Sequence, residues 1–459
     1  TGTSNFPLSR LYNLPSDKIL CQKVGSLHCL IAKVLSLTPL GTNKPLFIAC
    51  KSKFSSRPKP LASIKASTFV NTLVLSQHEG GECLDDTTHI AKDKALGMLI
   101  NQQTPTPQAI GTWLRRLGKN NQGVKALLKA NKTLLSSALH NCKNITLDID
   151  ASEVIANKVD AQWTYKSNKG YMPMVGHIAQ TSQIVATDFR AGNISPNTDN
   201  LGFIKHCQKA LPKGVKVNKL RIDAAGYQVK IIDYCFANKI EFAIRAKMCQ
   251  SLKDIIIDKD NKWQALLNKD GEAIDGQATF KMQHFIGKDG TIFDLIVQRT
   301  QIKGQSELDF ALDMNNANES KQDLAIGEYI YRAIATNLDG LSASNIIHFY
   351  NQRGEDSENR IKELKNDFGA KQMPCGDFNA NALYFDVCAL SYNLFAIMRQ
   401  LLPLEFVNKR AKYVRHRLYA IAAKVIQHGR QVIVKCQAQY YDSLAQVLNN
   451  IKALKPLLS

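Results

Sequence analysis

The chain has 459 residues, 44% of them apolar, and its 59 Lys and Arg outnumber its 39 Asp and Glu for a formal net charge of +20. This composition excludes a wholly disordered chain, because the apolar content is enough for packed cores, and the length predicts two to four structural units. The positive charge favours a polyanionic partner, with nucleic acid ahead of an acidic membrane surface.

Cysteine usage and apolar runs indicate a cytoplasmic protein. The eleven cysteines show no CxxC pair and no zinc-finger spacing, as expected of free thiols in a reducing compartment. Cys375 and Cys388 lie in apolar surroundings and are expected to be buried. The longest apolar stretch, Val387 to Met398, is shorter than the roughly 18 residues that span a bilayer, so we expect a buried helix there. No secretory signal is evident.

The first part of the chain is predicted to be a linker followed by helices. Residues 1–62 mix short apolar runs with Ser, Pro and Lys, which is typical of a basic, linker-like segment, either solvated or in contact with phosphate. Residues 63–143 carry apolar side chains at helical spacing. Asp85 and Asp86 are the predicted caps of one of these helices.

A basic amphipathic helix is predicted after residue 104. Thr106 and Pro107 fit a helix cap and a first-turn proline. Arg115 and Arg116 fall away from the apolar face. That face consists of Ile110, Trp113, Leu114 and Leu117. The pattern suits a helical DNA-binding region with both arginines on the DNA, and it equally suits a plain helical bundle with solvated arginines.

From residue 144 the pattern becomes that of an α/β domain. Residues 145–150 alternate apolar side chains with Thr146, Asp148 and Asp150, which predicts a strand with one apolar and one acidic face. Further strands are predicted at 172–179, 183–188, 217–223 and 241–246, and helices at 200–211 and 227–238. This order predicts a mixed sheet over residues 144–249.

The remaining chain is predicted in three parts. Residues 250–335 form a β-rich insertion, with a hairpin around Gly287 to Gly290. Residues 336–400 complete the core and include a helix near Glu358. Residues 401–459 are expected to be a basic helical region.

The candidate chemistry lies in acidic residues on these elements. Asp148 and Asp150 share a strand face, and Asp223 ends another strand. Glu358 shares a helix face with Lys362 and Lys365. Carboxylates converging from rigid elements suit two Mg²⁺ ions in phosphoryl transfer. Each acid also has a plain structural interpretation, since Asp often caps a turn and Glu358 with two lysines is typical of an exposed helix.

Several motifs occur together in chain order. They are TLDIDAS at 146–152, QWTYKSNKGYMPMVGHIA at 162–179, DFRAGNISP at 188–196, LRIDAAGY at 220–227, IATNL at 334–338, YNQRGEDSENRIKELKNDFG at 350–369 and FNANALYFDVCALSYNLF at 378–395. With these motifs the chain resembles bacterial insertion-sequence transposases with a DDE ribonuclease-H-like core, most closely the IS1380 group. The similarity runs from about residue 80 to about residue 435.

The resemblance implies a ribonuclease-H-like mixed sheet with a β-rich insertion and helical terminal regions. It implies that Asp150, Asp223 and Glu358 are the catalytic metal ligands for two Mg²⁺ ions, which Mn²⁺ can replace, with Asp148 as a nearby partner. Tyr350, Arg353 and Lys365 occupy the DNA-contacting places of the motif, with Lys362 beside them. The implied partners are double-stranded DNA, as terminal inverted repeats and target, and a second copy of the chain. The implied location is the bacterial cytoplasm, at the nucleoid.

Some alternatives stay open at this point. Asp148 competes with Asp150 as the first ligand, although the family's Asp-small-Ser pattern favours Asp150. Glu355 competes with Glu358, because four residues separate Arg353 from Glu358 where the family has three. The rival functions are a DNA-binding transposase remnant without catalysis, a ribonuclease-H-like nuclease that does not join strands, and a basic helical scaffold.

Overall fold

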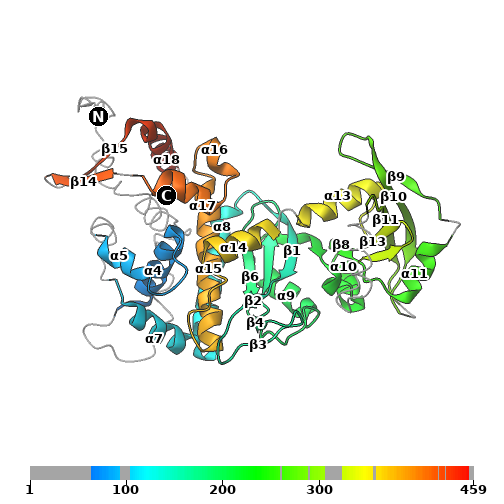
Figure 1. Ribbon diagram of the computed structural model, residues 1–459, viewed down its shortest axis with the longest axis horizontal. Coiled ribbons are helices and arrows are strands. Elements are labelled where there is room, and N and C mark those ends of the chain that lie inside the picture. The colour runs from blue at the N-terminus through cyan, green and yellow to red at the C-terminus, as the bar shows by residue number, and fades with distance from the viewer. Residues whose placement is uncertain are drawn as a thin grey trace. The chain divides into compact units, whose positions relative to one another are not determined.

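The computed structural model describes residues 64–93, 104–258, 261–287, 290–304, 323–354, 358–421, 423–428 and 431–453. The chain divides into two compact units (Figure 1). Unit 1 contains the described residues up to Ala130, together with Asn366–Cys375 and those from Asn379 onward. Unit 2 contains Asn131–Lys365 and Gly376–Phe378. The prediction for residues 1–62 lies outside the described part of the chain.

A mixed sheet forms the centre of unit 2. Its first five strands stand in the order β6-β5-β1-β7-β8. They are β1 (Asn144–Ala151), β5 (Met174–Ile178), β6 (Ile184–Asp188), β7 (Lys216–Ile222) and β8 (Glu241–Arg245). β5 is antiparallel to β1 and to β6, whereas β7 is parallel to β1 and β8 is parallel to β7. Three antiparallel strands continued by two parallel ones form a ribonuclease-H-like sheet, which confirms the predicted fold class.

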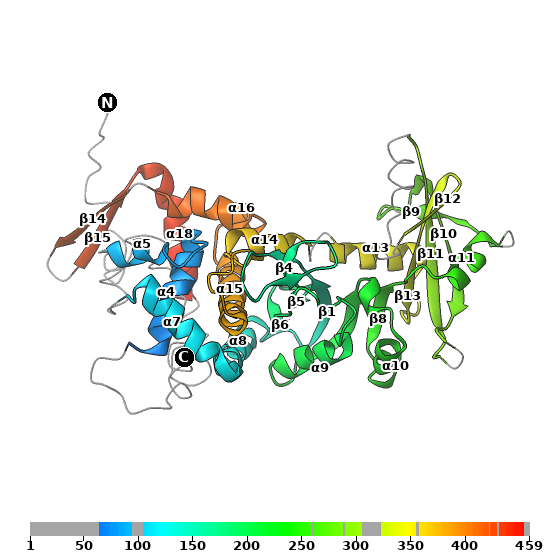
Figure 2. The same ribbon diagram turned by 60° about the horizontal axis from the view of Figure 1, so that its bottom comes forward.

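The β-rich insertion continues this sheet instead of forming a separate one. β8 pairs antiparallel with β13 (Tyr329–Thr336), and the sheet runs on through β11 (Phe293–Gln301), β10 (Ala273–His284) and β9 (Gln264–Leu267). β12 (Leu324–Ile326) pairs with β13. Figure 2 shows these strands extending from β8, on the side away from β5 and β6. β10 and β11 form the predicted antiparallel hairpin.

A helix packs on the apolar face of β1, and the opposite face of the strand is buried as well. The crossover helices are α9 (Asn200–Ala210) and α10 (Val229–Ala237). A Cβ added at Gly176 would lie 2.7 Å from the Cys207 sulfur and 3.5 Å from the Leu147 side chain, so α9 packs directly on this part of the sheet. Burial extends to Asp148, which is 0% exposed. The predicted acidic face of β1 is therefore a protein interior and not a surface.

Unit 1 is built mainly from helices. They include α4 (Ala66–Glu79), α5 (Thr87–Lys92), α7 (Pro107–Gly118), α8 (Gln122–Ala138), which continues into unit 2, and α15 (Phe378–Arg399). α15 is the one helix of the described residues that is long and apolar enough to cross a membrane, and 89% of its apolar window is buried. Gln77 of α4 donates to the Cys388 sulfur and accepts from Ser391 within this core. The prediction that residues 387–398 form a buried helix is confirmed.

The predicted helix caps have different outcomes. The Thr106 hydroxyl accepts a hydrogen bond from the Ala109 amide at 3.2 Å, which confirms it as the cap of α7. Asp86 precedes α5, but its carboxylate accepts from the amides of Glu82 and Cys83 instead of capping the helix. It therefore stabilises the turn before α5.

The C-terminal region contains a β-hairpin as well as the predicted helices. The helices include α16 (Leu404–Val407), α17 (Ala411–Val414) and α18 (Tyr441–Ala453). Between α17 and α18, β14 (Ala423–His428) pairs with β15 (Gln431–Cys436). The runs KVI and QVIV place β-branched residues on either side of Gly429, a combination that favours paired strands over a continuous helix.

Candidate active site

Two of the predicted acids lie at the ends of neighbouring parallel strands. Ile149 of β1 is in register with Ile222 of β7, so Asp150 and Asp223 follow at the same edge of the sheet. Asp223 is held by a hydrogen bond from the Ala225 amide to its carboxylate, at 3.0 Å, where a short 3₁₀ helix begins. The parallel register places both carboxylates at one end of the sheet, as predicted.

The electrostatics of Asp150 link all three predicted acids. The pKa of Asp150 is raised to about 6: burial raises it most, the neighbouring Arg353 lowers it, and the charges of Asp223 and Glu358 raise it. Each of the other two carboxylates is therefore near enough to repel Asp150. In this structure Asp223 and Glu358 therefore both lie within electrostatic range of Asp150.

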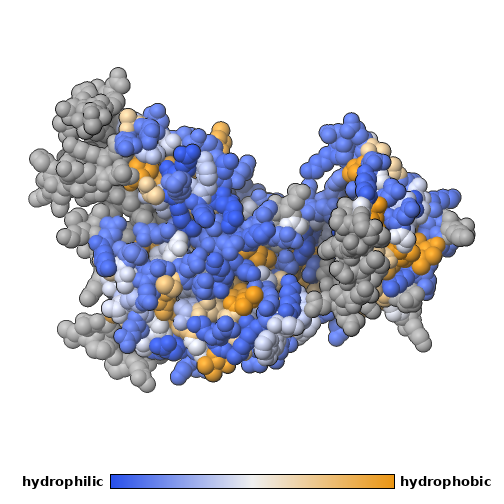
Figure 3. Space-filling model, in the orientation of Figure 1, coloured by the Kyte–Doolittle hydropathy of each residue, from blue (hydrophilic) through white to orange (hydrophobic). Residues whose placement is uncertain are grey.

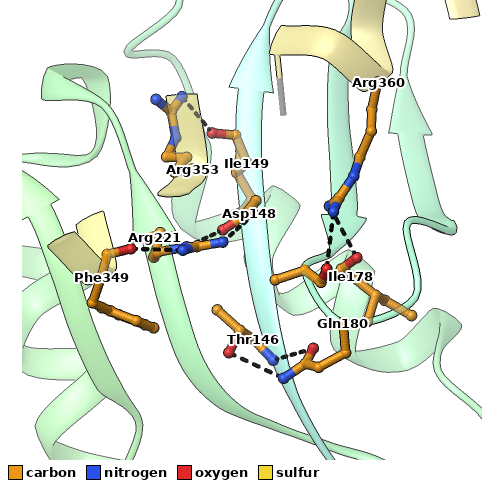
Figure 4. Close-up of polar contacts among 10 residues, drawn as sticks. Thr146, Asp148, Ile149, Ile178, Gln180, Arg221, Phe349, Arg353 and Arg360 are labelled. Carbon is orange, nitrogen blue, oxygen red and sulfur yellow. Dashed lines mark hydrogen bonds and ion pairs between the residues drawn. The ribbon is translucent and has the colours of Figure 1, made fainter. Parts of the chain in front are cut away.

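Glu358 stands exposed at the start of α14 (Asn359–Asp367). The alternative acid, Glu355, lies outside the described residues. Two residues beyond Glu358, the buried Arg360 donates to the backbone carbonyls of Ile178 and Ala179, at 3.1 and 2.9 Å (Figure 4). This contact fixes α14 to the end of β5. The sequence pattern did not predict a role for Arg360. The one local signal is its position between Glu358 and Lys362 on the same predicted helix.

Asp148 has a structural partner that the sequence did not reveal. Arg221 of β7 donates to both Asp148 oxygens, at 2.6 and 2.7 Å, and both side chains are at most 1% exposed (Figure 4). Arg221 also donates to the Phe349 carbonyl at 2.6 Å. Both Asp148 oxygens accept from Arg221, and the pair ties β1 and β7 to α13 (Ala343–Arg353). A contribution of Asp148 to metal binding stays a prediction.

Arg353 contacts β1 in this structure, and the DNA contact that the resemblance implies for it stays a prediction. Its buried guanidinium donates to the Ile149 carbonyl at 3.1 Å and lies 3.2 Å from an Asp150 oxygen. Burial alone would lower the pKa of Arg353, but Asp150 and then Tyr350 raise it above its ordinary range. Both contacts are made by one terminal nitrogen of the guanidinium, Nη2. In this structure it positions Asp150.

Tyr350 lies within the same charged neighbourhood. Burial raises the pKa of its phenol, Arg353 and Arg245 lower it, and Asp223 and Asp150 raise it. The ring packs partly against a buried apolar cluster that includes Ile334 and Ile346. Tyr350 therefore belongs to the site.

The two predicted lysines of α14 have different environments. Lys365 donates to the Glu153 carbonyl at 2.6 Å and to the Ser152 hydroxyl at 3.2 Å, just beyond β1. Lys362 is exposed. Lys365 thus secures the chain that follows Asp150, whereas Lys362 is free to face solvent or a ligand.

Arg115 and Arg116 lie in unit 1 and not in the unit that carries the acids. Both are exposed on α7, while Ile110, Trp113 and Leu114 on its other face are at most 2% exposed. The predicted division of this helix into a basic and an apolar face is confirmed.

The acids were tested for their fit to a divalent metal. Among the residues that the structure describes, no group of three or more His, Cys, Asp or Glu side chains is close enough together to hold a metal ion. Asp150 and Asp223 nevertheless supply hard oxygen ligands from adjacent rigid strands. Burial is the main reason that the pKa of Asp150 is raised, with smaller contributions from the charges of Asp223 and Glu358, and a bound cation would favour the ionised form. The two strand acids fit Mg²⁺, and Glu358 stands nearby without completing a three-carboxylate cluster.

The chain therefore has a ribonuclease-H-like sheet with one carboxylate on β1 and another directly after β7. A family model described as "Transposase DDE domain group 1" matches residues 54–285 and 314–456, and the chain belongs to this family. No curated protein matches the sequence. Among solved structures the chain is similar to "Cryo-EM structure of piggyBac transposase synaptic complex with hairpin DNA", at 12% identity and a TM-score of 0.45, over 87% of this chain and 80% of that chain.

Proposed function

We propose that this protein is the transposase of an insertion sequence of the IS1380 group, which cleaves DNA at the ends of its element and joins the freed strands to target DNA. The observation that supports this most is the placement of Asp150 and Asp223 on adjacent parallel strands, with Glu358 within electrostatic range, in a chain of the DDE transposase family.

Asp150, Asp223 and Glu358 would hold two Mg²⁺ ions, with Mn²⁺ as a substitute. When bound, such ions activate the attacking oxygen and stabilise the charge on the leaving oxygen. For Glu358 to ligate together with the strand acids, it would have to stand closer to them than it does in this structure. Arg353 holds Asp150 in place and favours its ionised form. Asp148 stays with Arg221 and serves the geometry of the strands.

The proposed partner is double-stranded DNA, both as terminal inverted repeats and as target. The formal charge of +20 supports a polyanionic ligand. Basic residues on α7 and in the segment 409–417 supply exposed positive charge. They include Arg115, Arg116, Lys409, Arg410, Lys412 and Arg417. Pairing two element ends calls for two copies of the chain, so we propose a homodimer on DNA, acting in the bacterial cytoplasm.

The test is a cleavage and joining assay with the full chain. The substrate is an end-labelled duplex carrying the inverted repeat that flanks the coding region, mixed with a supercoiled target plasmid. We expect nicks with a free 3′-OH and covalently joined product in Mg²⁺, and neither in excess EDTA. Nicks without joined product would point to a nuclease, and binding without nicks would point to a transposase remnant. Either result would overturn the proposal.

Substitutions of the two lysines of α14 are expected to differ in their effects on stability and on DNA binding. Lys365→Met removes charge-assisted hydrogen bonds to the Glu153 carbonyl and Ser152, so we expect about 1.5–3 kcal/mol lower stability in urea unfolding. The salt dependence of DNA binding should stay unchanged. Lys362→Met is the matched control on the same helix face. It should leave stability unchanged and reduce the slope of log K against log salt by about one. Reversed outcomes would contradict both assignments.

A further inference from the structure

An exposed apolar surface follows β1 directly. It is carried by a small sheet of β2 (Val154–Ile155), β4 (Lys169–Tyr171) and β3 (Gln162–Trp163) and the turns between them. Its large side chains are Val159, Trp163, Ile155 and Tyr165, exposed by 93, 66, 59 and 47%. We name these four residues, with Lys166, the aromatic platform. Figure 3 shows hydrophobic residues at the surface where β2 and β4 lie in Figure 1.

Tight packing beneath the platform keeps it rigid. Tyr171 is fully buried, donates from its hydroxyl to Asp160 at 2.7 Å and packs against Phe189. A Cβ at Gly170 would lie 2.1 Å from the Val154 carbonyl oxygen, and one at Gly192 would lie 2.3 Å from the Gln162 carbonyl oxygen. A surface this well supported loses little conformational freedom when it binds a ligand.

Glu153 connects the platform to the catalytic elements. Its carboxylate accepts hydrogen bonds from Thr164 and from Asn168, which fixes the turn that presents Tyr165 and Lys166. The carbonyl of Glu153 accepts from Lys365 on α14. The same residue therefore fixes the turn and contacts the helix that begins beside Glu358.

The platform lies close to the acids. Only four residues separate Asp150 from Ile155 along the chain. Burial raises the pKa of Tyr165, Lys166 lowers it, and Glu153 and then Asp223 raise it, which places the phenol within electrostatic range of Asp223. Burial lowers the pKa of Lys365, Glu153 raises it, and the charge of Lys166 lowers it, so the two ammonium groups are within electrostatic range of each other. A DNA strand whose phosphate reached the acids would pass over or beside the platform.

We propose that the aromatic platform binds unpaired nucleotides of the DNA strand next to the acids, by stacking their bases on Trp163 and Tyr165. Exposed aromatic faces beside positive charge are the chemistry that single-stranded nucleic acid selects, since every base offers a π-face and every linkage a phosphate. The Lys166 ammonium lies 5.6 Å from the Tyr165 ring centroid, where it can meet a phosphate beside a stacked base. The positive charge of Lys166 beside the Tyr165 ring favours an anionic ligand at the platform over a second copy of this chain.

The inference rests on the proposed function, because it takes DNA as the ligand of this site. The test uses the full chain and two labelled probes, a 20-nucleotide oligothymidine and a 20-base-pair duplex, read by fluorescence anisotropy. We expect Trp163→Ala to weaken oligothymidine binding about tenfold or more and to change duplex binding by less than about twofold. Trp163→Phe keeps an aromatic face and should restore most of the affinity. Oligothymidine should also quench the fluorescence of the wild type, and this quenching should be lost in Trp163→Phe.

Phe285→Ala is the matched control, since Phe285 is 49% exposed and follows β10, which belongs to the large sheet and not to the small sheet that carries the platform. It should bind both probes as the wild type does. Equal losses on both probes, or no loss on either, would overturn the platform assignment. So would a fall from dimer to monomer caused by Trp163→Ala alone, since that would mark a self-association surface. The cleavage assay stays a separate measurement: a wild type that stacks oligothymidine but never cleaves would refute the proposed function alone.

Discussion

Asp223→Asn is expected to lower Mg²⁺-dependent nicking by about 10²–10³-fold or more. The substitution removes the charge of a ligand that comes from a rigid strand end, so the site loses preorganised affinity for the cation. The fold should survive, because an Asn side-chain oxygen can still accept the hydrogen bond from the Ala225 amide. The measurement is single-turnover nicking of the end-labelled duplex, over a range of Mg²⁺ concentrations.

Asp275→Asn serves as the control for that experiment. It removes the same charge from unit 2 at an exposed position, where Asp275 pairs with Lys303 at the surface. Nicking should match the wild type. If Asp223→Asn nicked at the wild-type rate, or if both variants lost activity equally, the assignment of Asp223 to the metal site would be wrong.

Arg221→Met is expected to lower the free energy of unfolding by about 3–5 kcal/mol. The change leaves Asp148 fully buried without its cationic partner, and an uncompensated buried charge carries a cost of this size. It also removes the hydrogen bond to the Phe349 carbonyl, which ties β7 to α13. Urea unfolding followed by circular dichroism measures the loss.

The neighbouring ion pair on β7 provides a matched control. Lys219 lies 2.6 Å from Glu241, but their side chains are 33 and 42% exposed, so Lys219→Met should cost no more than about 1 kcal/mol. The double variant Asp148→Leu with Arg221→Met should recover much of the stability lost in the single variant, because no buried charge is left unpaired. A loss for Arg221→Met as small as that for Lys219→Met would contradict the buried-pair interpretation.

Local pattern was enough to predict the elements of the core. The alternation in residues 145–150 predicted β1, and Asp150 and Asp223 were identified at strand ends before any pairing was known. Thr106 was likewise identified as a cap from its place before Pro107. These features depend on neighbours within a few residues, which is the range over which sequence periodicity is informative.

The features that the sequence did not reveal depend on contacts between distant segments. The different surroundings of Asp148 and Asp150 come from the register that sets Asp148 opposite Arg221, 73 residues away along the chain. The same holds for Arg353, whose partners Ile149 and Asp150 lie on β1. An arginine in a basic motif gives no local sign of whether it will turn inward to a carboxylate or outward to phosphate.

The pairing of β8 with β13 also has a mechanical consequence. Ala243, Ile244 and Arg245 are hydrogen-bonded in register with residues 334–336, so the insertion shares one backbone ladder with the strands beside the acids. Such a ladder transmits bending and twist but does not allow a hinged swing. Excising residues 250–335 would leave β8 as an unprotected edge strand, prone to pair with other chains. The strands of the insertion are therefore an integral part of the central sheet and not a separable domain.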